Sequence, residues 1–199
     1  MRTMLIKSLA VALLIYFVVS DLLTTTPDVK QNPNPKMRYE ITLTVNDAPG
    51  SFDAVTGLAD YEVKDLSCVP VTGAPLNAMR MPPETKRIAI NFRRIANDVY
   101  RGDVYLDGVI DEDYFGLGVC HWSLDTVITF VRTNNLTLSP RIPREEFSIK
   151  KGRLTYFDRE NYKRNQVEET EYGWLHHSQI APNRQDHLFS ITLSAKEAF

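Results

Sequence analysis

The chain of 199 residues lacks the short motifs by which many enzymes are recognised. It has no G-x-S-x-G nucleophile elbow and no glycine-rich loop that could hold a phosphate. His176, His177 and His187 follow no established spacing of zinc ligands, so we expect surface histidines on loops and no metal site. We therefore expect a protein that is not an enzyme and binds no cofactor. A hydrolase with an unrecognised site is the remaining enzymatic alternative.

A general excess of positive charge is also missing, since 23 lysines and arginines stand against 25 acidic residues. Loss of residues 1–20 would remove two positive charges and no negative ones, which changes the formal charge from −2 to −4. Charge is nevertheless uneven along the chain, with six acids between positions 98 and 113 and eight bases between 141 and 164. Binding of a phosphate backbone needs basic residues on one face, so we expect no nucleic acid among the partners.

Only one long apolar run is present, Ser8–Val19, and two basic residues precede it. Its length falls short of the roughly 20 residues that a membrane span needs, but it suits the core of an export signal. We predict a signal peptide over residues 1–20, cleaved after Ser20, and hence a periplasmic or secreted protein. The alternative is an uncleaved Met4–Val19 anchor, which would hold the protein at the inner membrane facing the periplasm and be its only contact with lipid.

Proline-rich sequence follows this run, because Thr24–Pro35 holds three prolines and almost no large apolar residue. Such a composition predicts a linker over residues 21–36, either a tether or a frayed N-terminus. The remaining residues, 37–199, suffice for one well-buried domain.

Helical periodicity is scarce in that domain, whereas alternation of apolar and polar residues is frequent. Residues 159–172 are the one helix candidate, with a solvated loop as the alternative. Strands are expected at 39–45, 59–69, 87–95, 99–109, 147–151, 154–157 and 188–194, with a turn or bulge at Arg101–Gly102. Many short strands predict an all-β fold, an antiparallel β-sandwich of immunoglobulin-like general architecture, with a partly open barrel as the alternative.

Cys120 and His121 are neighbours, which raises the question of a catalytic thiol with its base. The residues alternating from Cys120 are Trp122, Leu124, Thr126, Ile128 and Phe130, a pattern that predicts a strand with this face in the core. Neighbours on a strand point to opposite sides of the sheet. The thiol and the imidazole therefore cannot form the short hydrogen bond that a catalytic pair needs.

The chain has one other cysteine, Cys68. An exported protein folds where thiols oxidise, so we predict a Cys68–Cys120 disulfide, with two buried thiols as the alternative. Closing a loop of this length would stabilise the fold by roughly 4 kcal/mol in the chain-entropy model. A bridge beside a buried tryptophan that clamps two layers is typical of immunoglobulin-like sandwiches, but the spacing of the two cysteines does not specify that topology.

A cluster of acids, Asp111, Glu112 and Asp113, directly precedes Tyr114 and Phe115. We expect either a solvated hairpin whose aromatics pack on the core, a loop that recognises a basic protein partner, or a weak calcium site. Under the recognition hypothesis the contact residues are the three acids and Tyr114.

Trp174, in the segment EYGWLHH, is a second candidate for partner binding, because aromatic residues dominate interface hot spots. A core aromatic after a glycine turn is its alternative role.

The export signal, the DLSCVP and DEDYFGLGVCHW segments and the β-rich body together resemble small exported envelope proteins of Gram-negative bacteria. The resemblance covers roughly residues 59–131. Some proteins of that kind are periplasmic immunity partners of type VI secretion effectors such as phospholipases. The resemblance thus implies a stoichiometric inhibitor of a secreted toxin or lipase effector. The alternative is a membrane-anchored structural or accessory component of the cell envelope.

Overall fold

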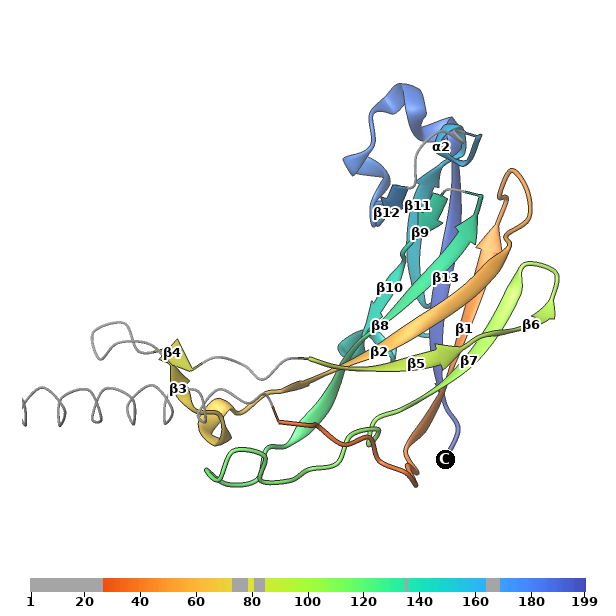
Figure 1. The fold of residues 1–199 in the computed structure, drawn as a ribbon. Coiled ribbons are helices and arrows are strands. Elements are labelled where there is room, and N and C mark those ends of the chain that lie inside the picture. The colour runs from red at the N-terminus through yellow and green to blue at the C-terminus, as the bar shows by residue number, and fades with distance from the viewer. Residues whose placement is uncertain (1–26, 73–78, 81–84, 135, 164–168) are drawn as a thin grey trace, which may run out of the picture.

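The computed structural model describes residues 27–72, 79–80, 85–134, 136–163 and 169–199. The predicted signal or anchor and the first part of the predicted linker lie outside these residues. The fold is mainly β, with 52% of the described residues in strands and 12% in helices, arranged as two packed sheets (Figure 1). The predicted β-sandwich is therefore confirmed. Within the described ranges, no helix is both long and apolar enough to cross a membrane.

The strands form two large sheets and one short hairpin. The first sheet has the order β11–β13–β1–β7–β6, with bounds Arg153–Asp158, Leu188–Glu197, Arg38–Asn46, Val99–Tyr105 and Arg93–Ala96. The second has the order β12–β9–β8–β2–β5, with bounds Glu169–Glu171, Leu136–Leu138, Trp122–Thr133, Ala54–Val63 and Lys86–Asn91; β10 (Arg141–Pro143) also pairs with β8. The hairpin joins β3 (Val71–Thr72) and β4 (Met79–Arg80).

Helical elements are short. They are η1 (Leu66–Cys68), η2 (Arg144–Glu146), α2 (Arg159–Lys163), η3 (His177–Gln179) and η4 (Pro182–His187). The strand pairs are antiparallel except β9–β12, which is parallel.

The buried face of β1 is the face that the alternation of apolar and polar residues predicts. Ile41, Leu43 and Val45 are buried, while Thr42 and Thr44 between them are partly exposed. The partners of β1 on both sides, β13 and β7, contribute further buried residues to the same core. Period-two patterning thus predicted this central strand correctly, because one of its faces is buried.

The predicted strand 87–95 is divided at Phe92 between the two sheets. Its first part, β5, pairs with β2 in the second sheet, whereas β6 pairs with β7 in the first. Two glycines make room for the crossing: a Cβ on Gly57 would lie 2.8 Å from the Phe92 ring, and one on Gly102 would lie 2.7 Å from Ile90. The chain therefore connects the sheets along this side, although the alternation runs through the corner without interruption.

A β-bulge changes the buried face of β8. Asp60 pairs with Thr126 and Tyr61 pairs with Leu124, so Asp125 is an extra residue on β8. Side chains point inward at Trp122 and Leu124 before the bulge and at 127, 129 and 131 after it. The prediction that 126, 128 and 130 continue the core face is wrong, because an inserted residue reverses the side on which every later side chain lies.

Three smaller expectations also differ from the structure. Residues 147–151 form a turn after η2 and no strand. The turn before β7 lies at Asn97–Asp98, where Asp98 has φ 57°, whereas Arg101–Gly102 lies inside the strand. The helix candidate 159–172 is helical only over α2 in its described part, which continues at Glu169–Glu171 as β12.

The segment 27–36 lies against the loop that follows β7 (Figure 1). Val29 is buried, and the amide of Asn32 donates to the carbonyl oxygen of Gly108 at 2.9 Å. The expected boundary of the folded unit at residue 37 is therefore too late. Proline-rich composition predicted a linker here because it carries no information about the surface on which the segment docks.

Acids from the 98–113 stretch hold this segment in place. The Asp107 carboxylate accepts hydrogen bonds from the amides of Lys36 and Met37 at 2.8 and 3.0 Å. Glu112 forms an ion pair with Lys30 at 2.7 Å. Part of the uneven charge therefore serves internal contacts of the fold.

Candidate functional site

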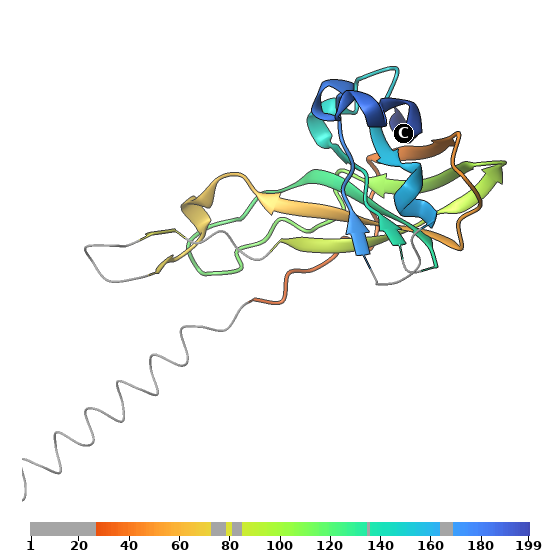
Figure 2. The same cartoon turned by 90° about the horizontal axis from the view of Figure 1, so that it is seen from above.

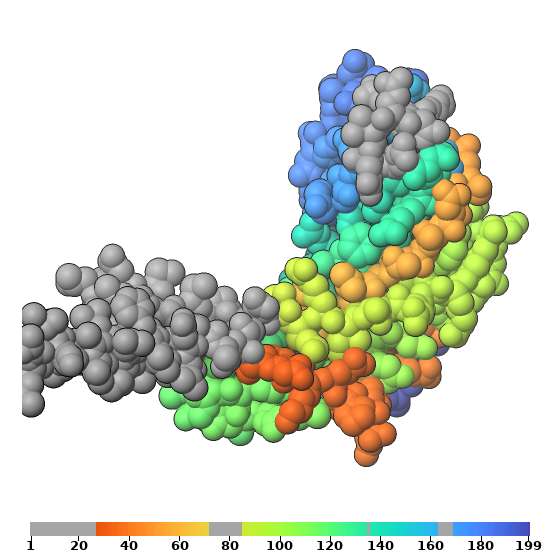
Figure 3. Space-filling view, viewed as in Figure 1, coloured from red at the N-terminus to blue at the C-terminus, as the bar shows by residue number. Residues whose placement is uncertain are grey.

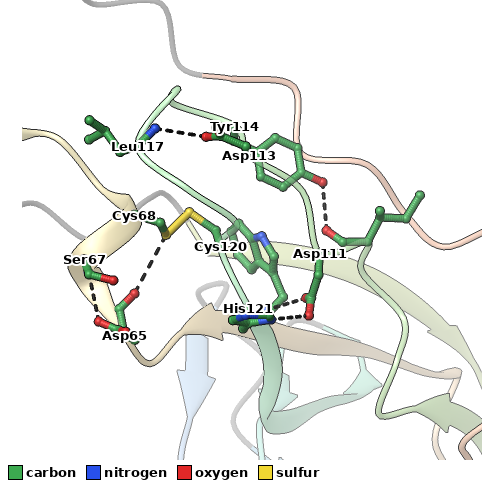
Figure 4. Close-up of a disulfide and its surroundings, with 11 residues drawn as sticks. Asp65, Ser67, Cys68, Asp111, Asp113, Tyr114, Leu117, Cys120 and His121 are labelled. Carbon is green, nitrogen blue, oxygen red and sulfur yellow. Dashed lines mark hydrogen bonds and ion pairs between the residues drawn. A yellow bond between two sulfur atoms is a disulfide. The ribbon is translucent and has the colours of Figure 1, made fainter.

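The cysteine pair forms the predicted disulfide between Cys68 and Cys120, whose Cα atoms are 5.3 Å apart (Figure 4). Cys68 ends η1, just beyond β2, and Cys120 precedes β8. Because β2 and β8 are neighbours in one sheet, the bridge joins two adjacent strand ends. The bridge therefore does not clamp the two layers, a point that the cysteine spacing left open.

His121 points away from the bridge, as the strand register predicted. Its ring Nδ1 lies 2.7 Å from Oδ2 of Asp111, and the imidazole is exposed (Figure 4). Cys120 is fully buried and bound to Cys68. The pair therefore offers no thiolate nucleophile with an adjacent base.

The three acids of the 111–113 cluster have different partners. Asp111 also accepts a hydrogen bond from the amide of Trp122 at 2.8 Å, and Asp113 accepts one from the amide of Leu117 at 3.0 Å. Glu112 pairs with Lys30, and this hydrogen bond raises the pKa of the Lys30 ammonium. Within the described ranges, no three acidic, histidine or cysteine side chains converge as metal ligands.

Tyr114 packs inward from the same loop. Its hydroxyl donates to the carbonyl oxygen of Ile110 at 2.9 Å and accepts from the amide of Lys30 at 3.2 Å. Its ring meets Trp122 edge to face, with centroids 6.3 Å apart. The interpretation of a hairpin with packed aromatics therefore describes the geometry of this loop; its role in recognition remains a prediction.

The tip of the loop is apolar, a feature that the sequence analysis missed. Leu117 is 53% exposed and Val119 is 50% exposed. Gly116 and Gly118, which flank Leu117, have φ of 70° and 111°, and a Cβ on either would meet nothing within 4 Å. The G-L-G spacing was the available signal, because paired glycines favour a projecting turn.

Trp174 forms a β-bridge with Tyr156 of β11. In Figure 1, β11 and β12 lie away from the 106–120 stretch, so the structure does not bring Trp174 together with residues 111–114. Its amide donates to the carbonyl of Tyr156 at 3.0 Å, and the Tyr156 amide donates back at 2.8 Å. A Cβ on Gly173 would lie 2.5 Å from Thr155, and its φ is 69°. Backbone pairing and the close approach at glycine hold Trp174 in one place.

Exposed side chains surround this anchor. Tyr172 is 61% exposed, with the Arg141 guanidinium 5.3 Å from its ring centroid, and Leu175 is 39% exposed. A hollow of about 300 Å³ adjoins them, lined by Asn161, Glu169, Glu171 and residues 172–174. We call Tyr172, Trp174 and Leu175 the aromatic end. Trp174 itself is half-buried, so its two predicted roles, core residue and anchor, are both compatible with its position.

A second hollow, of about 460 Å³, is lined by residues of β2, β5 and β7. Its walls include Tyr61, Ile88 and Val104, and the segment 31–35 forms one side. The Tyr61 hydroxyl donates to the carbonyl oxygen of Tyr105 at 2.5 Å, and burial raises the pKa of Tyr61. No local pattern in the sequence predicts this hollow, because its walls come from strands of both sheets.

No family model, no curated protein and no solved structure matches this chain. The fold and the geometry of the described surfaces therefore carry the functional argument. They define a β-sandwich with one disulfide, an aromatic end and, at the opposite end, an apolar loop tip.

Proposed function

We propose that this protein is an exported protein-binding module, most concretely a periplasmic immunity protein that neutralises a secreted antibacterial effector such as a toxin or lipase. The observation that supports binding is the aromatic end. Its exposed tyrosine and leucine flank a half-buried tryptophan whose backbone is held by β11.

Preorganisation is the physical reason for choosing this surface. Tryptophan and tyrosine are enriched among residues that contribute most to binding, and a group already held in place loses little conformational entropy when a partner arrives. At Trp174 the paired hydrogen bonds to Tyr156 supply that rigidity. The adjoining hollow offers space for a partner side chain beside the tryptophan.

The acidic loop is the second candidate contact. The carboxylates of Asp111, Glu112 and Asp113 each have a partner within the chain, so binding a basic protein there would compete with existing contacts. Charge in this loop would act mainly by steering association, which depends on ionic strength. The first experiment therefore tests the aromatic end.

The first test is co-purification of the tagged full-length protein from the envelope of its own host, with mass spectrometry of the partner and of the bait's N-terminus. A stoichiometric secreted hydrolase or toxin is the expected partner. Tyr172→Ala is expected to reduce recovery of that partner, while Phe199→Ala is the matched control because both rings are 61% exposed. Equal recovery with both variants, or no stoichiometric partner, would overturn the proposal.

The alternative function, a membrane-anchored component of the envelope, is supported by the apolar loop tip at the end where residue 27 enters the fold. Recovery of envelope proteins alone, with residues 1–20 still attached to the bait, would favour this alternative.

A further inference from the structure

Three exposed apolar side chains lie on the two segments that the disulfide joins, at the end of the molecule opposite the aromatic end. Val71, Leu117 and Val119 are 52%, 53% and 50% exposed, and we call them the apolar tip. Large aliphatic side chains exposed to this extent and gathered at one place mark an interaction surface more often than single ones do.

The disulfide links the two segments that carry these residues. Val119 directly precedes Cys120, and Val71 follows Cys68 by three positions, so the bridge holds two distant segments side by side. Figure 4 shows Leu117 at the far turn of the loop, with Asp113 bonded to its amide. The disulfide and this hydrogen bond therefore tie both segments to the sandwich.

The N-terminal part of the described chain lies at the same end. Lys30 contacts Glu112 and Tyr114 in the loop, and the segment after it is fastened along the domain. Figures 2 and 3 show the described residues from 27 onward lying beside the 106–120 stretch. The seven residues between Val19 and Pro27 can span at most roughly 25 Å. A bilayer that holds the apolar run Ser8–Val19 would thus lie near this end.

We propose that the apolar tip inserts into the interface of a lipid bilayer when the N-terminal apolar run is retained in that bilayer. The run keeps the tip at high local concentration near the lipid, so a small apolar surface suffices for contact. The sandwich would then stand with its aromatic end facing away from the membrane. This goes beyond the proposed protein binding and rests on retention of the N-terminal run.

Charge at this end decides the lipid used in the test. The loop contains three acids, which an anionic membrane surface would repel. Vesicles of zwitterionic phosphatidylcholine, with acyl chains brominated near the headgroup, are therefore the probe. Bromine quenches tryptophan fluorescence at contact distance and reports depth directly.

The experiment reconstitutes the full chain into these vesicles as two variants, Leu117→Trp and Ile95→Trp. Ile95 is a matched control, because it is 42% exposed and lies on β6, far from the tip in Figure 1. Val119→Trp is a second tip variant if Leu117→Trp fails to fold. Trp122 and Trp174 contribute the same background to every sample.

The expected result is that the fluorescence added by the tip variant is lost in brominated vesicles, while that of I95W is kept. Equal quenching of the two, or full chain that fails to float with the vesicles, would overturn the proposal. If a protein partner and not lipid occupied the tip, the two variants would be quenched equally. Failure here leaves the Tyr172→Ala experiment unaffected, so the two proposals are tested separately.

Discussion

Removing the disulfide is the perturbation with the largest predicted effect on stability. The bridge closes a loop with a sequence separation of 52 residues, and this loop contains β5, β6 and β7. Those strands belong to both sheets and include the crossing at Phe92. Loss of the bridge should therefore affect the whole domain and not the loop tip alone.

The magnitude follows from the entropy of the unfolded chain. For a loop of this length the chain-entropy model gives about 4 kcal/mol at 25 °C. For a domain of this size, about 4 kcal/mol corresponds to a fall in Tm of roughly 8–16 °C. Cys68→Ala/Cys120→Ala is the variant of choice, because both positions are buried and alanine places no polar atom there.

Equilibrium unfolding in urea, followed by tryptophan fluorescence and circular dichroism, measures the change. The wild-type protein in reductant should approach the double variant, and reductant should not change the double variant itself. A difference in unfolding free energy between wild type and double variant below about 1 kcal/mol would refute the reasoning. It would mean that the bridge does not lower the entropy of the unfolded chain as the model requires.

Two further predictions concern the surroundings of the N-terminal segment. Since the raised pKa of Tyr61 keeps its phenol protonated in the folded state while the unfolded phenol ionises near 10, stability should fall as the pH rises above about 10. Tyr61→Phe should make this fall of stability with pH less steep, and it should lower the unfolding free energy at neutral pH by about 1 kcal/mol because the hydrogen bond to Tyr105 is lost. Urea titrations of both proteins over a series of pH values measure the two effects. An equally steep fall in both proteins would contradict the prediction. Asp107→Ala removes the acceptor of two amides and should increase hydrogen exchange across residues 27–37 with little change in Tm, so unchanged exchange measured by mass spectrometry would argue against this fastening.

Local pattern predicted the elements whose environment is simple. β1 and β13 each have one buried face, so alternation identified both strands and, in β1, the inward residues. The cysteine pair followed from the presence of only two cysteines and an expected oxidising compartment. The orientation of His121 followed from strand geometry at the start of β8, before the bulge at Asp125.

Prediction failed where the partner of a strand decides its conformation. The bulge in β8 exists because the neighbours Asp60 and Tyr61 on β2 pair with Thr126 and Leu124, which leaves Asp125 as an extra residue between them. Nothing in the alternation of β8 marks this extra residue. The corner at Phe92 depends on Gly57 and Gly102, which lie far from it in sequence. The bridge likewise joins neighbouring strands because β2 pairs with β8, which the positions of the two cysteines do not reveal.

The candidate surfaces show the same difference between what local sequence predicts and what the folded chain decides. Composition alone singled out Trp174 and the acids at 111–113, because aromatic and charged residue types suggest recognition wherever they lie. Only the folded chain showed that these groups occupy opposite ends and that the acids already have partners.

By itself, the sequence determined the β class, the residues of the disulfide and the inward face of β1, since these depend on local alternation and on a count of two cysteines. Tertiary structure decided where the chain crosses between sheets, where segment 27–36 docks and which exposed side chains gather. These features depend on contacts between residues far apart in the chain. The segments that carry Val71 and Val119 are joined because Cys68 and Cys120 are bonded, and no local pattern contains that information.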